Sequence, residues 1–146
     1  MTTKTSTGLR NYMLATGSAR DALQNGKINY YSGDPPASAD DAATGVLLCS
    51  IDKDGYGNGF TLDNVAVGAV IAKAAGDLLR GTGLANGRAG YFRHVGANDT
   101  GTASTTEPRI QGSIAKSGSE GNVSNPDIVQ GAVTDIDEYA FALPTF

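Results

Sequence analysis

The segment Gly87–Val95, together with the turn Leu84–Gly87 that leads into it, constrains the fold more than any other stretch of the chain. It places two adjacent aromatic residues and a terminal valine in a run of strand length, and the Asn-Gly step before it is a strong short-range signal for a β-hairpin. Residues Asp77–Thr82 lead into this turn. The sequence therefore predicts a central strand at Gly87–Val95 with Asp77–Thr82 as its partner in a hairpin.

The rest of the chain repeats this pattern of short apolar or alternating runs separated by turn residues. Glycine supplies 20 of the 146 residues, which is costly inside helices but suits a protein with many short strands and turns. Further strands are expected at Lys27–Ser32, Val46–Ile51, Phe60–Leu62, Val65–Lys73, Arg109–Lys116, Pro126–Gln130 and Thr134–Leu143. About eight strands at this spacing predict an all-β fold, a β-sandwich or jelly roll in which two sheets pack face to face.

The N-terminal residues 1–24 contain the only helical candidate. Met1–Ser6 is polar and is expected to form a loose arm. In Thr7–Leu23 apolar residues recur at helical spacing, Gly17 interrupts the pattern, and Ser18 can cap a second turn. We therefore expect one broken helix or two short ones, followed by the β-sandwich, within a single domain over residues 1–146.

Charge and composition exclude several classes of protein. The net charge is −4 and lysine and arginine form no cluster, which argues against nucleic-acid binding. No apolar run approaches the roughly 18 residues of a membrane span, and the N-terminus lacks the apolar segment of a secretory signal. The single cysteine, Cys49, lies in an apolar run and is expected to be a buried small hydrophobe in a chain made at a reducing site.

The stretch Asp52–Asp63 has the most suggestive ligand spacing in the chain. Asp52, Asp54 and Asp63 fall at positions 1, 3 and 12 of a calcium-binding loop, with Gly57 at the sixth position. Tyr56 stands where an oxygen ligand belongs, Asp63 replaces the longer glutamate, and the flanking runs are strand-like. These departures favour a hairpin turn with glycines at positive φ, and whether the loop binds a cation stays open.

No group of residues indicates an active site. His94 is the only histidine, and no nucleophile-elbow motif accompanies it, so a structural or interface role is expected. One histidine and one cysteine are too few for a zinc site. The carboxylates typical of solvated turns are Asp34, Asp40, Asp41, Asp135, Asp137 and Glu138. We therefore predict a non-enzymatic protein with no catalytic residue, no cofactor and no metal ligand.

A family resemblance adds to this interpretation. The segments that carry it are Ser6–Tyr12, Tyr31–Asp40, Gly45–Cys49, Ala89–Arg93, Arg109–Gly112 and Phe141–Pro144. In this order they resemble a group of small virion proteins of tailed bacteriophages, encoded among head and tail structural genes, and the likeness runs over most of the chain. The resemblance implies a component of the phage particle. Within that class we favour a capsid decoration or cement protein that bridges and stabilises major capsid subunits.

The resemblance also implies partners and a location. The partners would be the major capsid protein and further copies of the chain, in a homodimer or homotrimer, with neither nucleic acid nor membrane bound. The protein would be made in the bacterial host cytoplasm and lie on the capsid surface of the virion. Contacts are expected at the N-terminal arm and helix and at the loop Gly96–Glu107. Removing residues 1–24 is expected to leave a folded domain that no longer binds shells.

Two alternatives belong to other functional classes. The first is a tail, collar or fibre component that binds a host-surface receptor or glycan, and the tyrosines expected to be exposed for this purpose are Tyr31 and Tyr56. The second is a small glycan hydrolase, which requires two carboxylates in one cleft at the separations known for glycosidases.

Overall fold

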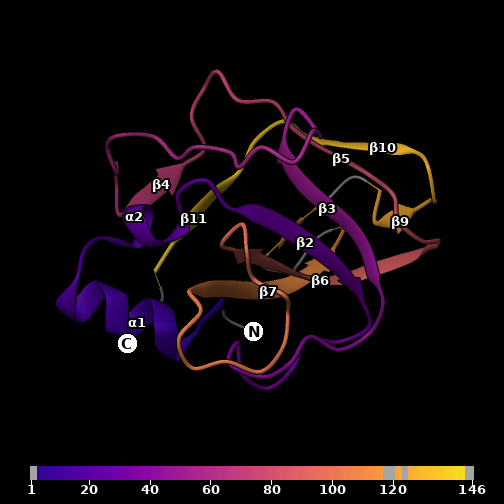
Figure 1. Ribbon diagram of the computed structural model, residues 1–146. Helices are drawn as coiled ribbons and strands as arrows, with labels where there is room; N and C mark the ends of the chain where they lie inside the picture. The colour runs from indigo at the N-terminus through magenta and orange to yellow at the C-terminus, as the bar shows by residue number, and fades with distance from the viewer. Residues whose placement is uncertain (1–2, 117–120, 123–124, 144–146) are drawn as a thin grey trace.

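The computed structural model describes residues 3–116, 121–122 and 125–143. Within these residues it contains the helices α1 (Thr7–Ala15) and α2 (Ala19–Leu23) and eleven strands (Figure 1). The strands are β1 (Lys4–Thr5), β2 (Lys27–Ser32), β3 (Leu47–Lys53), β4 (Val70–Ala72), β5 (Leu79–Thr82), β6 (Gly87–Val95), β7 (Arg109–Ala115), β8 (Gly121–Asn122), β9 (Asp127–Ile128), β10 (Val133–Ile136) and β11 (Ala140–Ala142). The predicted all-β fold with a short N-terminal helical segment is confirmed. Neither of these helices is long and apolar enough to cross a membrane.

Most of the strands belong to one curved sheet. Its main path runs β1-β7-β6-β2-β3-β5-β10, with β8 added beside β7 and β9 beside β6, while β4 and β11 form a separate ribbon. All pairs are antiparallel except β7 with β8. The strand β6 pairs with β2 along one edge and with β7 along the other, so its predicted central place is confirmed.

The predicted hairpin between β5 and β6 is wrong. The strand β5 pairs with β3 and β10, and the first residues of β6 pair with β9 instead. The Asn-Gly turn is held by a different segment of the chain: Gly83 N donates to the Ala132 carbonyl at 2.8 Å, and Gln130 N donates to Asn86 Oδ1 at 2.8 Å. These bonds direct the two ends of the turn into different strand pairs.

The inner face of the sheet is apolar and forms the core. Alternation along β2, β6 and β7 turns one set of side chains inward: Ile28, Tyr30, Phe92, His94, Ile110 and Ile114. The helices cover part of this face through Leu9 and Leu23, both fully buried, and the C-terminal ribbon contributes Phe141. The expected pair of short helices is present, with Ser18 capping the second as predicted.

The outer face of the same strands is polar, yet it is also buried. The loops 33–46 and 96–108 lie over this face. The side chains that they cover are Asn29, Tyr31, Tyr91, Arg93, Arg109, Gln111 and Ser113. Figure 1 shows the first of these loops running beneath the strands. The sheet is therefore covered on both faces, with apolar packing on one side and hydrogen bonding on the other.

Two local expectations from the sequence are corrected by the structure. The described part of Met1–Ser6 is not a loose arm, because Lys4–Thr5 pairs with β7 and Ser6 is fully buried; Met1 and Thr2 lie outside the described residues. The run Val65–Lys73 is not one continuous strand, because only Val70–Ala72 is a strand, and residues 63–70 are exposed.

Candidate interaction surfaces

Arg109 organises the polar face of the sheet. Its guanidinium is fully buried and donates from Nε and Nη2 to the two carboxylate oxygens of Asp99, at 2.6 and 2.8 Å. The remaining donors reach the carbonyls of Ala39 and Thr102, at 3.1 and 2.6 Å. Because Ala39 and Asp99 belong to different loops, this one side chain fastens both loops to β7. A buried bidentate pair of this kind is strong only when its other donors are also satisfied, as they are here.

The start of α1 is joined to the same loops. Ser6 Oγ accepts hydrogen bonds from Leu9 N and Arg109 N and donates to the Glu107 carbonyl at 2.8 Å. The Asp40 carboxylate accepts from both Thr7 N and Thr7 Oγ1, and these bonds contribute to holding its pKa below the ordinary value. The two segments expected to make contacts, the N-terminal residues and Gly96–Glu107, are thus packed together.

His94 is a core residue. It is fully buried between Phe60, Tyr139 and Phe141, with ring centroids 5.0, 5.4 and 5.8 Å away. Nε2 lies 3.2 Å from the Leu23 carbonyl, which can only accept, so Nε2 carries the proton and Nδ1 accepts from the Tyr139 hydroxyl at 2.9 Å. Burial lowers the pKa of His94 to about 4. The ring therefore stays neutral and ties α2 to the C-terminal segment.

The calcium-like spacing does not assemble a site. Asp52 Oδ2 accepts from Gly57 N at 3.0 Å, while the Asp63 carboxylate accepts from Asn64 N at 2.8 Å in a separate turn. Asp54 and Gly55 have φ of 63° and 79°, as expected for a tight hairpin turn. Among the described residues no three histidine, cysteine, aspartate or glutamate side chains gather where they could hold a metal ion.

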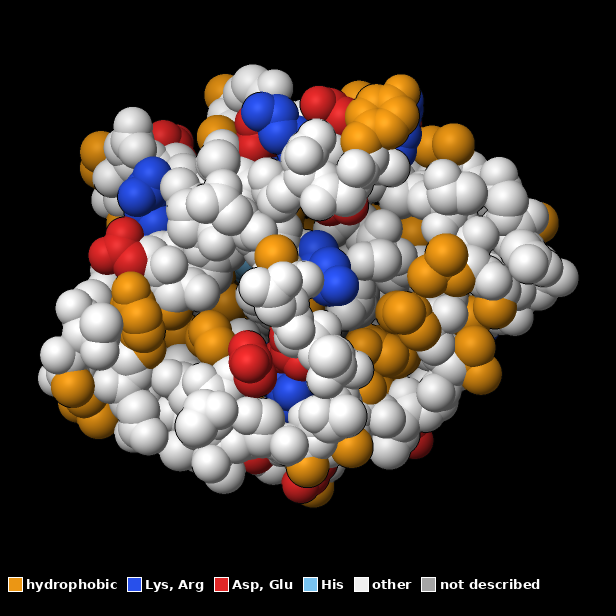
Figure 2. Space-filling view, in the orientation of Figure 1, with side chains coloured by type: hydrophobic (Ala, Val, Ile, Leu, Met, Phe, Trp, Pro, Cys, Tyr) orange, Lys and Arg blue, Asp and Glu red, His pale blue; other side chains and the backbone are white. Residues whose placement is uncertain are grey.

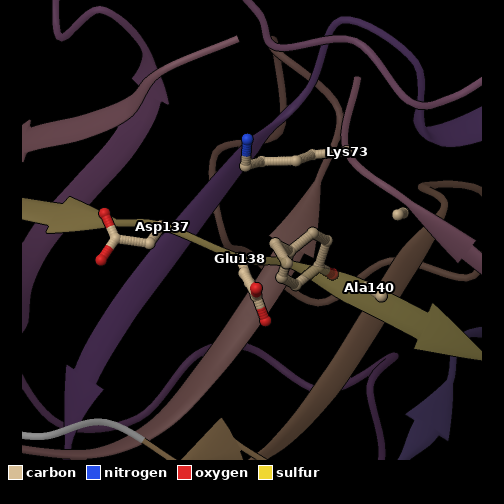
Figure 3. A pocket seen from close by; sticks show the side chains of 6 residues that line it. Lys73, Asp137, Glu138 and Ala140 are labelled. Carbon is tan, nitrogen blue, oxygen red and sulfur yellow. The ribbon is translucent and has the colours of Figure 1, made fainter. Parts of the chain in front are cut away.

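The acidic residues that are close together in the sequence near the C-terminus do not form a catalytic pair in the structure. Asp135 forms an ion pair with Arg80 at 2.6 Å. Asp137 and Glu138 line an open hollow of about 500 Å³ with Lys73 and Tyr139, and Figure 3 shows the two carboxylates pointing in different directions with Lys73 directed away from both. The Lys73 ammonium donates instead to the Asp77 carbonyl at 2.9 Å. This hollow therefore lacks the pair of facing carboxylates that glycoside hydrolysis requires.

The two tyrosines that were expected to be exposed have different environments. Tyr31 is buried, because its ring stacks on Tyr91 with centroids 5.0 Å apart and planes 13° from parallel, so its expected exposure is wrong. Tyr56 lies at the tip of the turn after β3 and is 85 % exposed.

A hairpin over residues 62–73, here called the valine finger, carries an exposed apolar surface. Leu62 bridges to Lys73 at its base, and the Val67 and Val70 backbones exchange hydrogen bonds of 2.9 and 3.1 Å at its tip. Val65 and Val67 are 66 % and 76 % exposed. Runs of consecutive exposed apolar residues are avoided in soluble domains unless they contact something.

A second exposed apolar surface lies at the other end of the molecule. Leu84 and Val129 lie in two neighbouring turns joined by the bond from Gly131 N to the Gly83 carbonyl, and Val133 begins β10 after the second turn; we call these three residues the turn patch. Figure 1 places β9 and β10, which flank this patch, opposite to α2 and β4. Figure 2 shows hydrophobic side chains gathered over the half of the visible face that holds β3, β9 and β10.

A third surface is a hollow of about 500 Å³ at the start of the chain, here called the cationic pocket. Its lining combines Lys4 and Arg10 with alanines and threonines, among them Ala37 and Ala39. Lys4 Nζ donates to the Ala37 carbonyl at 2.7 Å and Arg10 Nη1 to the Thr5 carbonyl at 3.0 Å, so both cations are held at the pocket.

Comparison of the chain with protein-family models, curated proteins and solved structures finds no match. The function is therefore proposed from the resemblance seen in the sequence and from the surfaces described above.

Sequence reasoning missed the polar layer and the valine finger. Arg93 and Arg109 alternate with apolar residues along their strands, a pattern that equally describes a strand with one solvated face. Two arginines within predicted strands were the available signal, because arginine is rarely buried without acidic or carbonyl partners. For Val65–Lys73 the apolar, β-branched composition favoured a strand, and Gly68 indicated at most a bulge, whereas Gly68 and Ala69 form a turn.

Proposed function

We propose that this protein is a non-enzymatic structural component of a tailed-bacteriophage particle, a decoration or cement protein that bridges and stabilises major capsid subunits. The resemblance over most of the chain supports the particle, and the turn patch supports the role. Its three exposed apolar side chains, from two turns that are bonded to each other and from the start of β10, form a preorganised contact surface. Such a surface binds without the entropic cost of ordering loops.

The architecture suits a bridging role because the polar loops are fixed in place. Arg109, Asp99 and Ser6 hold the helix and both covering loops against the sheet. A rigid domain can transmit force between two subunits, whereas loosely attached loops would stretch first. Repetition of one modest contact over a shell adds up through multivalency, so the turn patch can act with an area too small for a stable isolated complex.

The test is sedimentation of the purified protein with undecorated shells of the phage that encodes it. The wild-type chain should co-sediment to saturation, and Val129→Asp, which puts a charge into the turn patch, should weaken binding by roughly tenfold or more. Tyr56→Ser changes an equally exposed side chain outside the patch and should bind like wild type. Equal binding by Val129→Asp would remove the turn patch from the proposal.

The second candidate is a tail, collar or fibre component that binds a host-surface glycan. The observation that favours it is Tyr56, an aromatic ring held at a turn tip and 85 % exposed, as a sugar-stacking side chain would be. On this alternative, the protein would fail to bind shells but would bind host cells, and Tyr56→Ser would abolish that cell binding while Val129→Asp would leave it intact.

A further inference from the structure

Three polar side chains stand in one row across the centre of the sheet. Arg93 on β6 lies directly opposite Asn29 on β2 and directly opposite Gln111 on β7. Opposed residues of neighbouring strands point to the same face of a sheet, with Cβ atoms about 4.5–5.5 Å apart. Arg93 is fully buried, and Gln111 and Asn29 are only 1 % and 5 % exposed. The row therefore lies inside the protein, on the polar face of the sheet.

The loop 33–46 covers this row and supplies part of its hydrogen bonding. Arg93 Nε donates to Gln111 Oε1 at 3.0 Å. Arg93 Nη2 donates to the Asp41 carbonyl at 2.9 Å, and Gln111 Nε2 donates to the Pro36 carbonyl, also at 2.9 Å. The loop therefore fixes the Arg93 guanidinium from above while Gln111 fixes it from the side.

Two buried polar atoms of the row have no partner. Within the part of the chain that the structure describes, Arg93 Nη1 and Asn29 Oδ1 make no hydrogen bond. Arginine keeps its charge in a protein, and a buried donor or acceptor without a partner loses the bonds that it makes to water in the unfolded chain. Nearly all such atoms in native proteins are bonded to protein or to an ordered water.

The geometry directs these two atoms towards each other. In a planar guanidinium Nη1 is directed away from the Nε–H, which here points to Gln111 on β7, so Nη1 lies towards β2 and Asn29. Burial raises the pKa of Tyr31, and a hydrogen bond from the Asn29 side chain opposes this rise. Only the amide nitrogen of Asn29 can donate that bond, which leaves its oxygen as the unused acceptor.

The chemistry of the two atoms decides what can join them. Arg93 Nη1 needs an acceptor, and Asn29 Oδ1 needs a donor. An anion would accept from Nη1 but would also face the amide oxygen, and a cation would be repelled by the guanidinium. A water molecule both accepts and donates, and a buried water typically makes about two to four bonds to otherwise unsatisfied polar groups.

We propose that an ordered water molecule bridges Arg93 Nη1 and Asn29 Oδ1 beneath the loop 33–46. This water gives Arg93 an acceptor that Gln111 and Asp41 do not supply, and it joins β2 to the hydrogen-bonded layer that covers β6 and β7. The site lies inside the domain and includes no residue of the turn patch. It therefore holds or fails independently of the proposed function.

The first experiment is a crystal structure of the wild-type protein, from crystals grown with and without sodium bromide. The expected result is one electron-density peak about 2.7–3.2 Å from both Arg93 Nη1 and Asn29 Oδ1, with no anomalous signal from bromide. A direct bond between the two side chains would overturn the proposal, and so would the absence of density between them. An anomalous bromide peak at this position would replace the water with an anion.

Two variants test the bridge itself. Asn29→Leu removes the acceptor, so the water should be lost. Gln111→Leu removes a neighbour that bonds to Arg93 through Nε and leaves both partners of the water in place, so the water should remain. A water that persists in Asn29→Leu, or that disappears from a folded Gln111→Leu, would overturn the bridge.

Nuclear magnetic resonance measures the same site in solution. Nuclear Overhauser effects between a long-lived water and the guanidinium hydrogens of Arg93 should be present in the wild type and in Gln111→Leu, and absent in Asn29→Leu. Their absence in the wild type would contradict the proposal. If a variant does not fold, the two wild-type measurements decide the question.

Discussion

Arg109 is one of the residues that attach the outer loops to the sheet, and it bonds to both of them. Its fully buried side chain donates to Asp99, Ala39 and Thr102, and its backbone N–H donates to Ser6 Oγ. A charge in this position is stabilising only while its partner is present, because the protein interior cannot solvate an isolated ion.

Replacing this arginine should cost a large part of the stability. In Arg109→Met the Asp99 carboxylate is left buried without its partner, and we expect a loss of about 3–5 kcal/mol in the free energy of unfolding, measured by urea denaturation. Arg88→Met breaks the Arg88–Asp127 pair, whose side chains are each 61 % exposed, and should cost less than about 1 kcal/mol. Similar losses in the two variants would show that Arg109 does not hold the layer.

His94 should make stability depend on pH in a window that can be assigned to one side chain. Its pKa is about 4 in the folded protein and about 6.5 in an unfolded chain, so the unfolded state binds the proton first. The contribution is fully present above about pH 6.5 and is lost as pH falls towards 4, by roughly 3 kcal/mol in total.

Because His94 is the only histidine, the variant His94→Gln isolates this effect. Glutamine can still donate to the Leu23 carbonyl and accept from Tyr139, so the fold should persist while the pH dependence between 6.5 and 4 is flattened. The measurement is denaturation of both proteins at a series of pH values. A variant whose stability falls as steeply as wild type would assign the pH dependence to the carboxylates instead.

At the scale of elements, the N-terminal helices are part of the domain and not an appendage. Leu9 of α1 and Leu23 of α2 are fully buried in the core, and the Leu23 carbonyl accepts the hydrogen bond from His94. A Cβ added to Gly8 would lie 2.4 Å from the Thr106 carbonyl carbon, which shows how closely α1 approaches the covering loop. These contacts change the expectation for a truncated chain.

Removal of residues 1–24 should abolish folding and not merely shell binding. Two buried leucines, at roughly 2–5 kcal/mol each, account for much of the roughly 5–15 kcal/mol that stabilises an ordinary domain. Near-ultraviolet circular dichroism and urea denaturation should show no cooperative transition for the truncated chain, whereas a chain that begins at Lys4 and keeps β1 should unfold cooperatively. A cooperative, native-like transition after removal of residues 1–24 would restore the picture of a separate arm.

How much of this could be predicted depends on whether a feature leaves a local pattern. The alternation along β7 and the Ser18 cap are local, and both were predicted. The partner of Asp77–Thr82 is set by bonds from residues 130–132, far along the chain, and Asn-Gly alone could not reveal it. The polar layer joins Asp99 to Arg109 and Ser6 to Glu107 across long or irregular loops. Such loops have no helical or strand periodicity of apolar residues from which the contacts could be predicted. The apolar surfaces were missed because composition alone does not distinguish buried valines from exposed ones.

At the scale of the whole molecule, the protein is a β domain covered on both faces of its sheet, with apolar surfaces left at separate ends (Figures 1 and 2). We propose that the turn patch contacts the capsid. In this proposal the same modest contact is repeated at every copy, so that its gain is multiplied over the particle.

The most direct measurement of the proposed cement function is the heat stability of shells with and without the bound protein. Undecorated, DNA-free shells of the encoding phage would be saturated with the wild-type chain, and the number of bound copies per capsid subunit would be counted. Disruption of the shells would then be followed on heating. The account predicts a fixed ratio of bound copies to capsid subunits and disruption at a higher temperature for decorated shells, with no increase for shells mixed with Val129→Asp. Shells that bind no copies, or that bind them in a fixed ratio and still come apart at the same temperature, would contradict it.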